Sequence, residues 1–83
     1  MKCRYLDGDA VPFRTAAQRK ALVGKRIEYL RSCDIDCSGR GYFFPRIGIV
    51  ESASGVALYL ENGSDVHRSD LVELRVLDEE SAP

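Results

Sequence analysis

The 83-residue sequence has no tryptophan, only three cysteines, a single histidine and no long apolar run. No segment approaches the roughly 18–20 apolar residues that cross a bilayer, which argues against a membrane-spanning helix. Residues 1–6 are followed at once by Asp7-Gly8-Asp9, which interrupts the apolar segment that a signal peptide needs, so we expect a cytoplasmic protein. An odd number of cysteines cannot complete a disulfide framework, and we expect reduced thiols.

What remains is enough for one small domain, with 45% hydrophobic and 30% charged residues and a net charge of −1. We divide it into an N-terminal arm (1–14), a domain (15–77) and an acidic tail (78–83). The charge is bipolar: residues 1–46 carry ten Lys or Arg against five Asp or Glu, whereas residues 47–83 carry two against eight. An anionic partner would therefore meet the first half of the chain.

The first regular element is predicted to be a short helix over residues 16–23. Thr15 and Gln18 have the spacing of a capping box, and Gly24 stands where a left-handed residue ends a helix. Residues 25–31 are then predicted to form a strand with Ile27 and Tyr29 facing inward. One long helix running through Gly24 to residue 30 is the alternative, at a cost of about 1 kcal/mol for the interior glycine.

The second half of the chain predicts an antiparallel sheet, because apolar residues alternate in three short runs, 46–51, 56–61 and 72–77. Asn62-Gly63 predicts a type I′ hairpin, and residues 68–71 a single helical turn that Ser69 or Asp70 caps. Asp7-Gly8 predicts a two-residue hairpin between residues 3–6 and 9–13. The inward-facing residues of the three runs are expected to be Ile47, Ile49, Val56, Leu58, Leu60, Val72, Leu74 and Val76.

This order of elements resembles a small SH3-like barrel of the Tudor or KOW type over residues 24–77. The resemblance rests on Gly24-Lys25-Arg26-Ile27, a long loop, Arg46-Ile47-Gly48-Ile49-Val50, a hairpin, and Ser69-Asp70-Leu71 before the last strand. It implies a mostly β domain, a short helix followed by a five-stranded barrel over residues 25–77, whose long loop and neighbouring strands form a binding surface. Barrels of this kind bind nucleic acids, peptides or proteins, and fold alone does not choose among these ligands.

A nucleic-acid surface is the first functional hypothesis. Residues 40–46 interleave arginine with aromatic rings, a composition that contacts phosphates while stacking on bases. The predicted contact residues are Lys25, Arg26, Arg31, Arg40, Tyr42, Phe43 and Arg46. The alternative is that one or two of these aromatic side chains are needed in the core of a domain without tryptophan.

A protein-binding surface is the second hypothesis, and the acidic half of the chain keeps the two nearly level. Here Leu30, Val50, Tyr59 and Leu77 would lie on the face opposite Ile27, Ile49, Leu58 and Val76 and would bind a protein partner or a second copy of the chain. The structural alternative is that the helix covers this outer face through Ala17, Ala21 and Leu22.

Metal sites and catalytic groups are not expected, so we interpret the protein as a non-enzymatic binding module without a cofactor. Residues 34–39 begin like a calcium loop, but Pro45 stands where its bidentate glutamate belongs. Zinc ligands would have to come from separate elements, namely Cys3, Cys33, Cys37 and His67. His67-Arg68-Ser69-Asp70 places triad residue types in one turn, whereas a working triad draws them from separate elements.

Overall fold

The computed structural model describes residues 2–36 and 42–77 of the chain. The elements follow one another as a helix, five strands and two short 3₁₀ turns. They are α1 (Ala16–Lys20), β1 (Arg26–Arg31), η1 (Ser32–Asp34), β2 (Arg46–Ala53), β3 (Ala57–Leu60), β4 (Asp65–His67), η2 (Arg68–Asp70) and β5 (Leu71–Val76).

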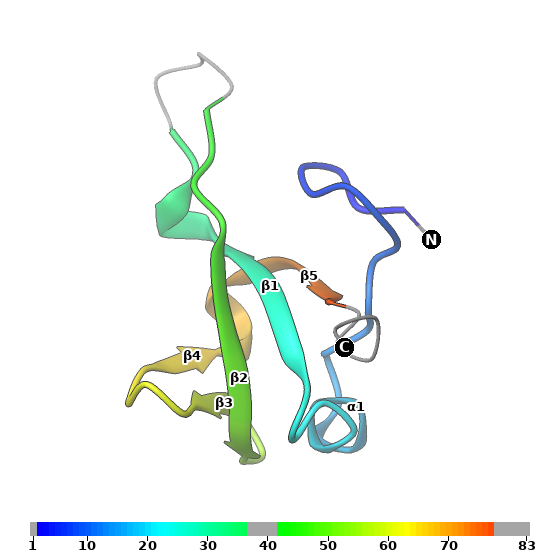
Figure 1. The fold of residues 1–83 in the computed structure, drawn as a ribbon, viewed down its shortest axis with the longest axis vertical. Coiled ribbons are helices and arrows are strands. Elements are labelled where there is room, and N and C mark those ends of the chain that lie inside the picture. Colours follow the sequence, from blue (N-terminus) through cyan, green and yellow to red (C-terminus); the bar gives the residue numbers. More distant parts are fainter. Residues whose placement is uncertain (1, 37–41, 78–83) are drawn as a thin grey trace, which may run out of the picture.

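The strands form one antiparallel sheet in the order β4-β3-β2-β1-β5 (Figure 1). β1 pairs with β2 on one side and with β5 on the other, so the last strand returns beside the first. Within the described residues β4 and β5 do not pair with each other, and the sheet is open at both of these strands. The prediction of a mostly β, antiparallel five-stranded domain with one short helix is confirmed.

The helix begins as its sequence predicts and ends earlier. Gln18 donates its backbone N–H to the Thr15 hydroxyl, and its side chain accepts the Thr15 N–H, which completes the capping box. The regular helix covers Ala16–Lys20 rather than 16–23, and turns carry the chain on to Gly24, where φ is +85°. That left-handed conformation reverses the chain into β1, and glycine adopts it without the strain that a side chain would cause. The long-helix alternative is therefore wrong.

A buried arginine joins α1 to two other segments. Arg19 is 1% exposed, and its guanidinium donates to the carbonyl oxygens of Phe13 and Arg14, both at 2.9 Å, and to those of Ser54 and Gly55. None of these acceptors is a carboxylate, so the charge is compensated by peptide dipoles alone. Arg19 therefore fixes the end of the N-terminal arm and the β2–β3 turn against the helix.

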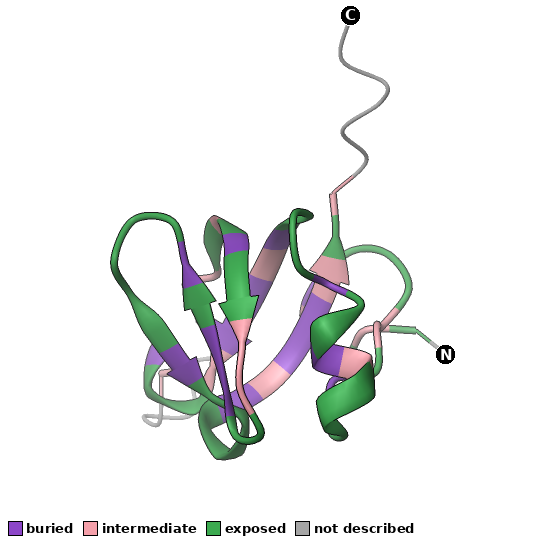
Figure 2. Ribbon diagram, turned by 90° about the horizontal axis from the view of Figure 1, so that it is seen from below, coloured by how far each residue is buried: buried purple, intermediate pink, exposed green. Residues whose placement is uncertain are grey.

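The core lies on one face of the sheet, and buried residues gather on the strands while the turns are exposed (Figure 2). Ile27, Tyr29 and Leu58 face inward as predicted. The inward-facing residue of β2 was predicted wrongly: Val50 is fully buried, whereas Ile47 and Ile49 are exposed. The core cluster consists of Phe13, Leu22, Ile27, Tyr29, Val50, Leu58, Leu60, Val66, Leu71 and Leu74.

Two exposed apolar residues further along the sheet also correct the predicted pattern. Val56 lies just before β3 and Val76 ends β5, and both are exposed because neither position is covered by another element at the end of its strand. Leu60 and Leu74 keep the predicted alternation. In β5 the register shift beside β1 puts Leu71 in the core cluster in place of Val72, which is half-buried.

The two turns around β4 form where the sequence predicts them but with different chemistry. Gly63 donates its N–H to the Leu60 carbonyl at 3.0 Å and has φ of +90°, whereas Asn62 does not have positive φ. The connection is therefore a three-residue loop with a left-handed glycine and not a type I′ turn. The 3₁₀ turn η2 is capped by the His67 ring, whose Nδ1 accepts the Ser69 N–H at 3.2 Å, rather than by Ser69 or Asp70.

The N-terminal arm packs on the sheet. Cys3 donates to the Gly8 carbonyl at 3.0 Å, so the turn at its tip is longer than the predicted two-residue hairpin. The carboxylate of buried Glu73 accepts the backbone N–H groups of Tyr5 at 2.8 Å, of Leu6 at 3.0 Å and of Arg4. Because β5 pairs Glu73 with Leu30 of β1, these bonds hold the arm at that end of the sheet.

This arrangement corrects the expected role of the helix. Leu30 and Leu6 are both buried, although neither belongs to the main core cluster. The arm therefore covers the outer face of the sheet near Leu30, whereas Ala17 and Ala21 of the helical segment are exposed and Leu22 lies in the main core.

We predict that Arg19→Met lowers the free energy of unfolding by about 2–4 kcal/mol, because it leaves several carbonyl oxygens without their donor. Urea denaturation followed by circular dichroism measures this, since the chain has no tryptophan to report by fluorescence. Lys20→Met, at the exposed neighbouring position, is the control and is expected to stay within about 0.5 kcal/mol of the parent. Equal stability of the two variants would contradict a clamping role for Arg19.

Candidate functional site on the outer face of the first two strands

The register of β1 with its two neighbours defines an outer face of the sheet. Arg26 lies opposite Ile49, and Glu28 lies between Ile47 on β2 and Arg75 on β5. Residues directly opposite each other point to the same side of an antiparallel sheet. Since Ile27 between them is fully buried, these five side chains share the side that faces away from the core.

The arm covers only one end of this face. At the other end Ile47 is 51% exposed and Ile49 is 37% exposed, although both are β-branched aliphatic residues within a strand. Their neighbours Glu28 and Arg75 pair with each other, Arg75 Nε donating to Glu28 Oε1 at 2.6 Å. The uncovered end is therefore apolar along β2 and charged along β1.

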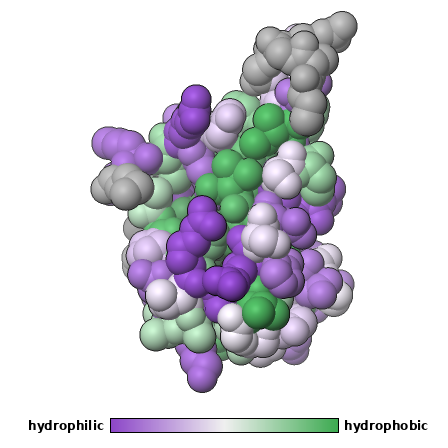
Figure 3. All heavy atoms as spheres, turned by 180° about the vertical axis from the view of Figure 1, so that it is seen from behind, coloured by the Kyte–Doolittle hydropathy of each residue, from purple (hydrophilic) through white to green (hydrophobic). Residues whose placement is uncertain are grey.

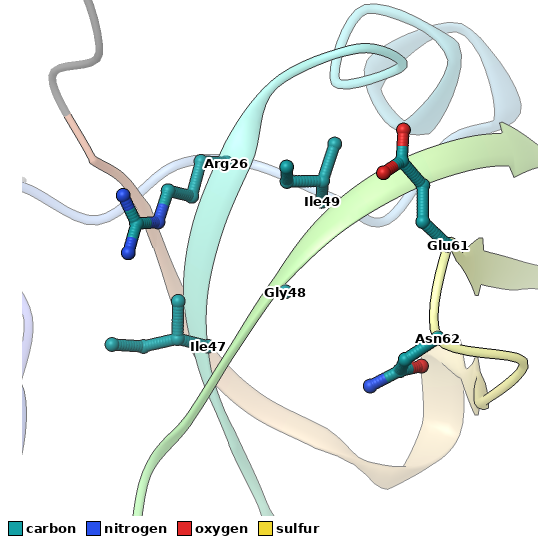
Figure 4. Close-up of a pocket in the computed structure, with 6 residues that line it drawn as sticks. All are labelled: Arg26, Ile47, Gly48, Ile49, Glu61 and Asn62. Atoms are coloured by element: carbon teal, nitrogen blue, oxygen red, sulfur yellow. The ribbon is translucent and has the colours of Figure 1, made fainter.

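A shallow pocket of about 350 Å³ lies over this uncovered end (Figure 4). Arg26 stands on one side of the two isoleucines and Glu61 on the other, so charges of both signs flank an apolar strip. Gly48 has no side chain to point toward the core, and the space is taken by Leu60. A Cβ on Gly48 would lie only 3.1 Å from Cδ1 of Leu60. We call the set lining the pocket the β1–β2 face: Arg26, Ile47, Gly48, Ile49, Glu61 and Asn62.

Two residues of the predicted nucleic-acid set form ion pairs with Asp34. Arg31 donates from Nε to Asp34 Oδ2 at 2.9 Å, and Arg46 donates to the same oxygen at 3.3 Å. Asp34 is buried, and the hydrogen bond from Arg31, aided by that from Arg46, lowers the pKa of its carboxyl. The same hydrogen bond raises the pKa of Arg31. This cluster fastens the base of the β1–β2 loop to the sheet.

The aromatic residues at the base of that loop divide into packed and exposed rings. The ring centroid of Phe43 lies 5.5 Å from that of Tyr5 in an edge-to-face contact, and the Phe43 backbone forms an isolated antiparallel bridge with Ile35. Tyr42 is 58% exposed and Phe44 is 64% exposed. Arg40 lies outside the described residues.

The two remaining basic residues of the predicted set, Lys25 and Arg26, are exposed where β1 begins. Arg31 ends the same strand, five residues or about 16 Å from Arg26. The structure therefore divides the predicted nucleic-acid set: Arg31, Phe43 and Arg46 gather at the base of the loop, whereas Lys25 and Arg26 lie beside the pocket.

The predicted protein-binding set is corrected in two positions. Leu30 and Val50 are fully buried, the first under the N-terminal arm and the second in the core, so neither side chain is available to a partner. Tyr59 is exposed on β3, opposite Ser52, and Leu77 is half-buried after β5. Ile47, Ile49, Glu61 and Asn62 were not predicted as site residues, although the alternation Ile47-Gly48-Ile49 is equally compatible with an outward phase.

Other reactive groups remain apart in the described residues. Burial raises the pKa of the Cys3 thiol, and Cys33 carries a free thiol, while Cys37 lies outside the described residues. Over residues 2–36 and 42–77, no three Cys, His, Asp or Glu side chains converge as metal ligands would. The His67 Nδ1 lies 2.7 Å from the Ser69 hydroxyl within the capped turn η2.

The lowered pKa of Asp34 predicts an acid-dependent stability. The carboxylate contributes above the ordinary aspartate pKa of 3.8, and its contribution is lost as the pH falls through the lower folded value. Asp34→Asn is therefore expected to be less stable than the parent at pH 7. The difference between the two proteins should shrink below pH 3.8, as the parent's carboxylate becomes protonated. Urea midpoints between pH 2 and 7 measure the difference. A difference that does not change with pH would contradict the ion-pair explanation.

Similarity to known proteins adds no assignment to this geometry. None of the described helices has the length and apolar character needed to cross a membrane. The chain matches no protein-family model, no curated protein and no solved structure.

Proposed function

We propose that this protein is a small, non-enzymatic binding module that docks a protein partner on the β1–β2 face. The observation that carries the proposal is the exposure of Ile47 and Ile49 between Arg26 and Glu61. Exposed aliphatic side chains gain free energy when a partner covers them, at about 25 cal/mol for each Å² removed from water. An uncovered apolar strip on a small domain is therefore a reason to expect a partner.

The charges around the strip favour a protein over a polyanion. Arg26 would attract a carboxylate of the partner, whereas Glu61 on the other side would repel a phosphate backbone and attract lysine or arginine. A protein surface with an apolar centre and charges of both signs at its rim satisfies both sides at once. A second copy of this chain belongs to the same class of partner.

The strand order supports an SH3-like barrel as the finer fold assignment. The long connection after β1, two short hairpins through β4 and a 3₁₀ turn before β5 follow the order of elements in that family. This likeness is compatible with a binding role and leaves the choice of ligand to the surface.

The test replaces the two isoleucines by threonine, which keeps the β-branched shape and adds a polar group. We expect Ile47→Thr/Ile49→Thr to retain the fold. When immobilised, it should retain at least ten-fold less of a partner from a lysate of the source organism than the immobilised parent does. Val56→Thr, at an exposed apolar position outside the pocket, is the matched control and should retain the parent's partners. Sedimentation of all three proteins at tens of micromolar tests whether the partner is a second copy. Identical retention and sedimentation of the three would contradict the proposal.

Nucleic acid is the second candidate ligand, and the exposed rings of Tyr42 and Phe44 are the observation that favours it. Aromatic rings that are open to solvent can stack on unpaired bases. Against it, the Arg31 and Arg46 guanidinium groups are bound to Asp34.

The nucleic-acid hypothesis predicts opposite effects from two substitutions. Asp34→Asn releases two arginines and should strengthen binding of mixed-sequence single strands, with a steeper salt dependence of about −0.7 in the log–log slope for each new phosphate contact. Tyr42→Ala should remove on the order of 1–3 kcal/mol of stacking and leave the slope unchanged. Fluorescence anisotropy at 50 mM salt measures both. No binding by the parent up to roughly 100 µM would exclude this function.

A further inference from the structure

A second and larger hollow lies between the N-terminal arm and β5. Its volume is about 630 Å³, and it is separate from the β1–β2 face because the two share no lining residue. A band of hydrophobic side chains bordered by hydrophilic ones is also visible on the rear of the molecule (Figure 3). We call the hollow the arm groove; it is lined by Lys2, Arg4, residues 10–14, Val72, Glu73 and Leu74.

The floor of the arm groove is aliphatic and fixed in place. Val11 donates its backbone N–H to the Leu74 carbonyl at 2.9 Å, which attaches the arm to β5 at the middle of the groove. Val11 and Val72 are half-buried, so these two side chains present apolar atoms at the surface of the groove. Leu74 is fully buried beneath that surface. The groove is thus formed before any ligand arrives, and a ligand would not have to order it.

Three cations at the rim of the arm groove have no carboxylate partner. Lys2, Arg4 and Arg14 are exposed, and none of them forms an ion pair with another of the described residues. The carboxylate that lines the groove, Glu73, is buried and accepts the N–H groups of the arm. The lining of the groove thus carries three cationic side chains against one carboxylate, and its formal charge is positive.

Aromatic rings rather than carboxylates hold the two arginines. The Arg4 guanidinium lies 5.9 Å from the centroid of the Tyr5 ring, and that of Arg14 lies 5.0 Å from the centroid of the Phe13 ring. A guanidinium stacked on a ring keeps the N–H groups at its edge, where they can bind a carboxylate with two parallel hydrogen bonds.

We infer that the arm groove binds an extended acidic peptide segment of a partner, with an aliphatic side chain on the Val11–Val72 floor and carboxylates at Lys2, Arg4 and Arg14. The floor favours a peptide over a nucleic acid, because base stacking needs an open ring and Phe13 is buried. Carboxylates meet the positive rim, and an aliphatic side chain covers the floor. This site is independent of the proposed docking on the β1–β2 face.

The experiment titrates the 83-residue chain into the fluorescein-labelled peptide Glu-Glu-Leu-Val-Glu-Glu at 50 mM salt and follows anisotropy. We expect saturable binding below about 1 mM that weakens as salt is raised. Two comparison peptides separate charge from apolar contact: Lys-Lys-Leu-Val-Lys-Lys reverses the charge, and Glu-Glu-Ser-Ser-Glu-Glu removes the aliphatic side chains. Both are expected to bind at least ten-fold more weakly.

Variants of the protein locate the contact. Arg14→Glu and Arg4→Glu change exposed side chains and are each expected to weaken binding by about three- to ten-fold or more. Lys20→Glu makes the same charge change at an exposed position outside the groove and is expected to have less than a two-fold effect. Ile47→Thr/Ile49→Thr should bind the peptide like the parent, so failure here and failure of the β1–β2 face are distinguishable.

Amide shifts of isotopically labelled protein provide a second measurement. Binding at the arm groove should perturb Val11, Val72 and their neighbours and leave Ile47 and Ile49 unchanged. Three results would overturn the inference: absence of saturable binding below 1 mM, equal affinity for the serine peptide, or an equal loss of affinity in Lys20→Glu and Arg14→Glu. A mixed-sequence oligonucleotide that displaced the peptide and bound more tightly would assign the groove to nucleic acid instead.

Discussion

The Arg19 guanidinium is the contact on which the relative placement of arm, helix and sheet depends. Desolvating an unpaired cation is expensive, and in this protein carbonyl oxygens from the end of the arm and from the β2–β3 turn compensate for it. The end of the arm, the first turn of helix and the β2–β3 turn thus depend on one side chain, and an 83-residue chain gains order that its small core could not supply by apolar burial alone.

A second buried charge decides which part of the sheet remains open. Glu73 receives the N–H groups of the arm, and this places the arm over Leu30 at one end of the outer face. The described part of the arm does not cover the other end, where Ile47 and Ile49 are exposed. The uncovered apolar strip is therefore a consequence of where Glu73 stands on β5, and the same contact brings the arm beside β5 to form the arm groove.

The parts of the fold that depend on neighbours in sequence were predictable, and those that depend on distant contacts were not. The helix start, β1 and the turn at Gly63 follow from local chemistry and were correctly placed. The face of β2 was predicted wrongly because Ile47 and Val50 offer two competing phases. Tertiary packing selects the second phase, with Gly48 against Leu60 and Val50 in the core. Sequence periodicity also identified Leu30 as outward-facing without revealing that the arm covers it. A buried arginine and a buried glutamate run against the usual exposure of charged residues, so no local pattern indicates them.

The bipolar charge of the sequence does not become a basic face and an acidic face in the folded protein. Asp34 pairs with both Arg31 and Arg46 at the base of the loop, and Glu28 pairs with Arg75 across the sheet. The Asp34 cluster involves two cations, Arg31 and Arg46, that composition alone assigns to a ligand. Among the described cations of the first half that have no carboxylate partner, Arg26 lies beside the β1–β2 face and Lys2, Arg4 and Arg14 lie around the arm groove, where aliphatic side chains are their neighbours. Charge next to aliphatic surface selects ligands that carry both, and peptides meet that requirement more fully than a phosphate backbone does.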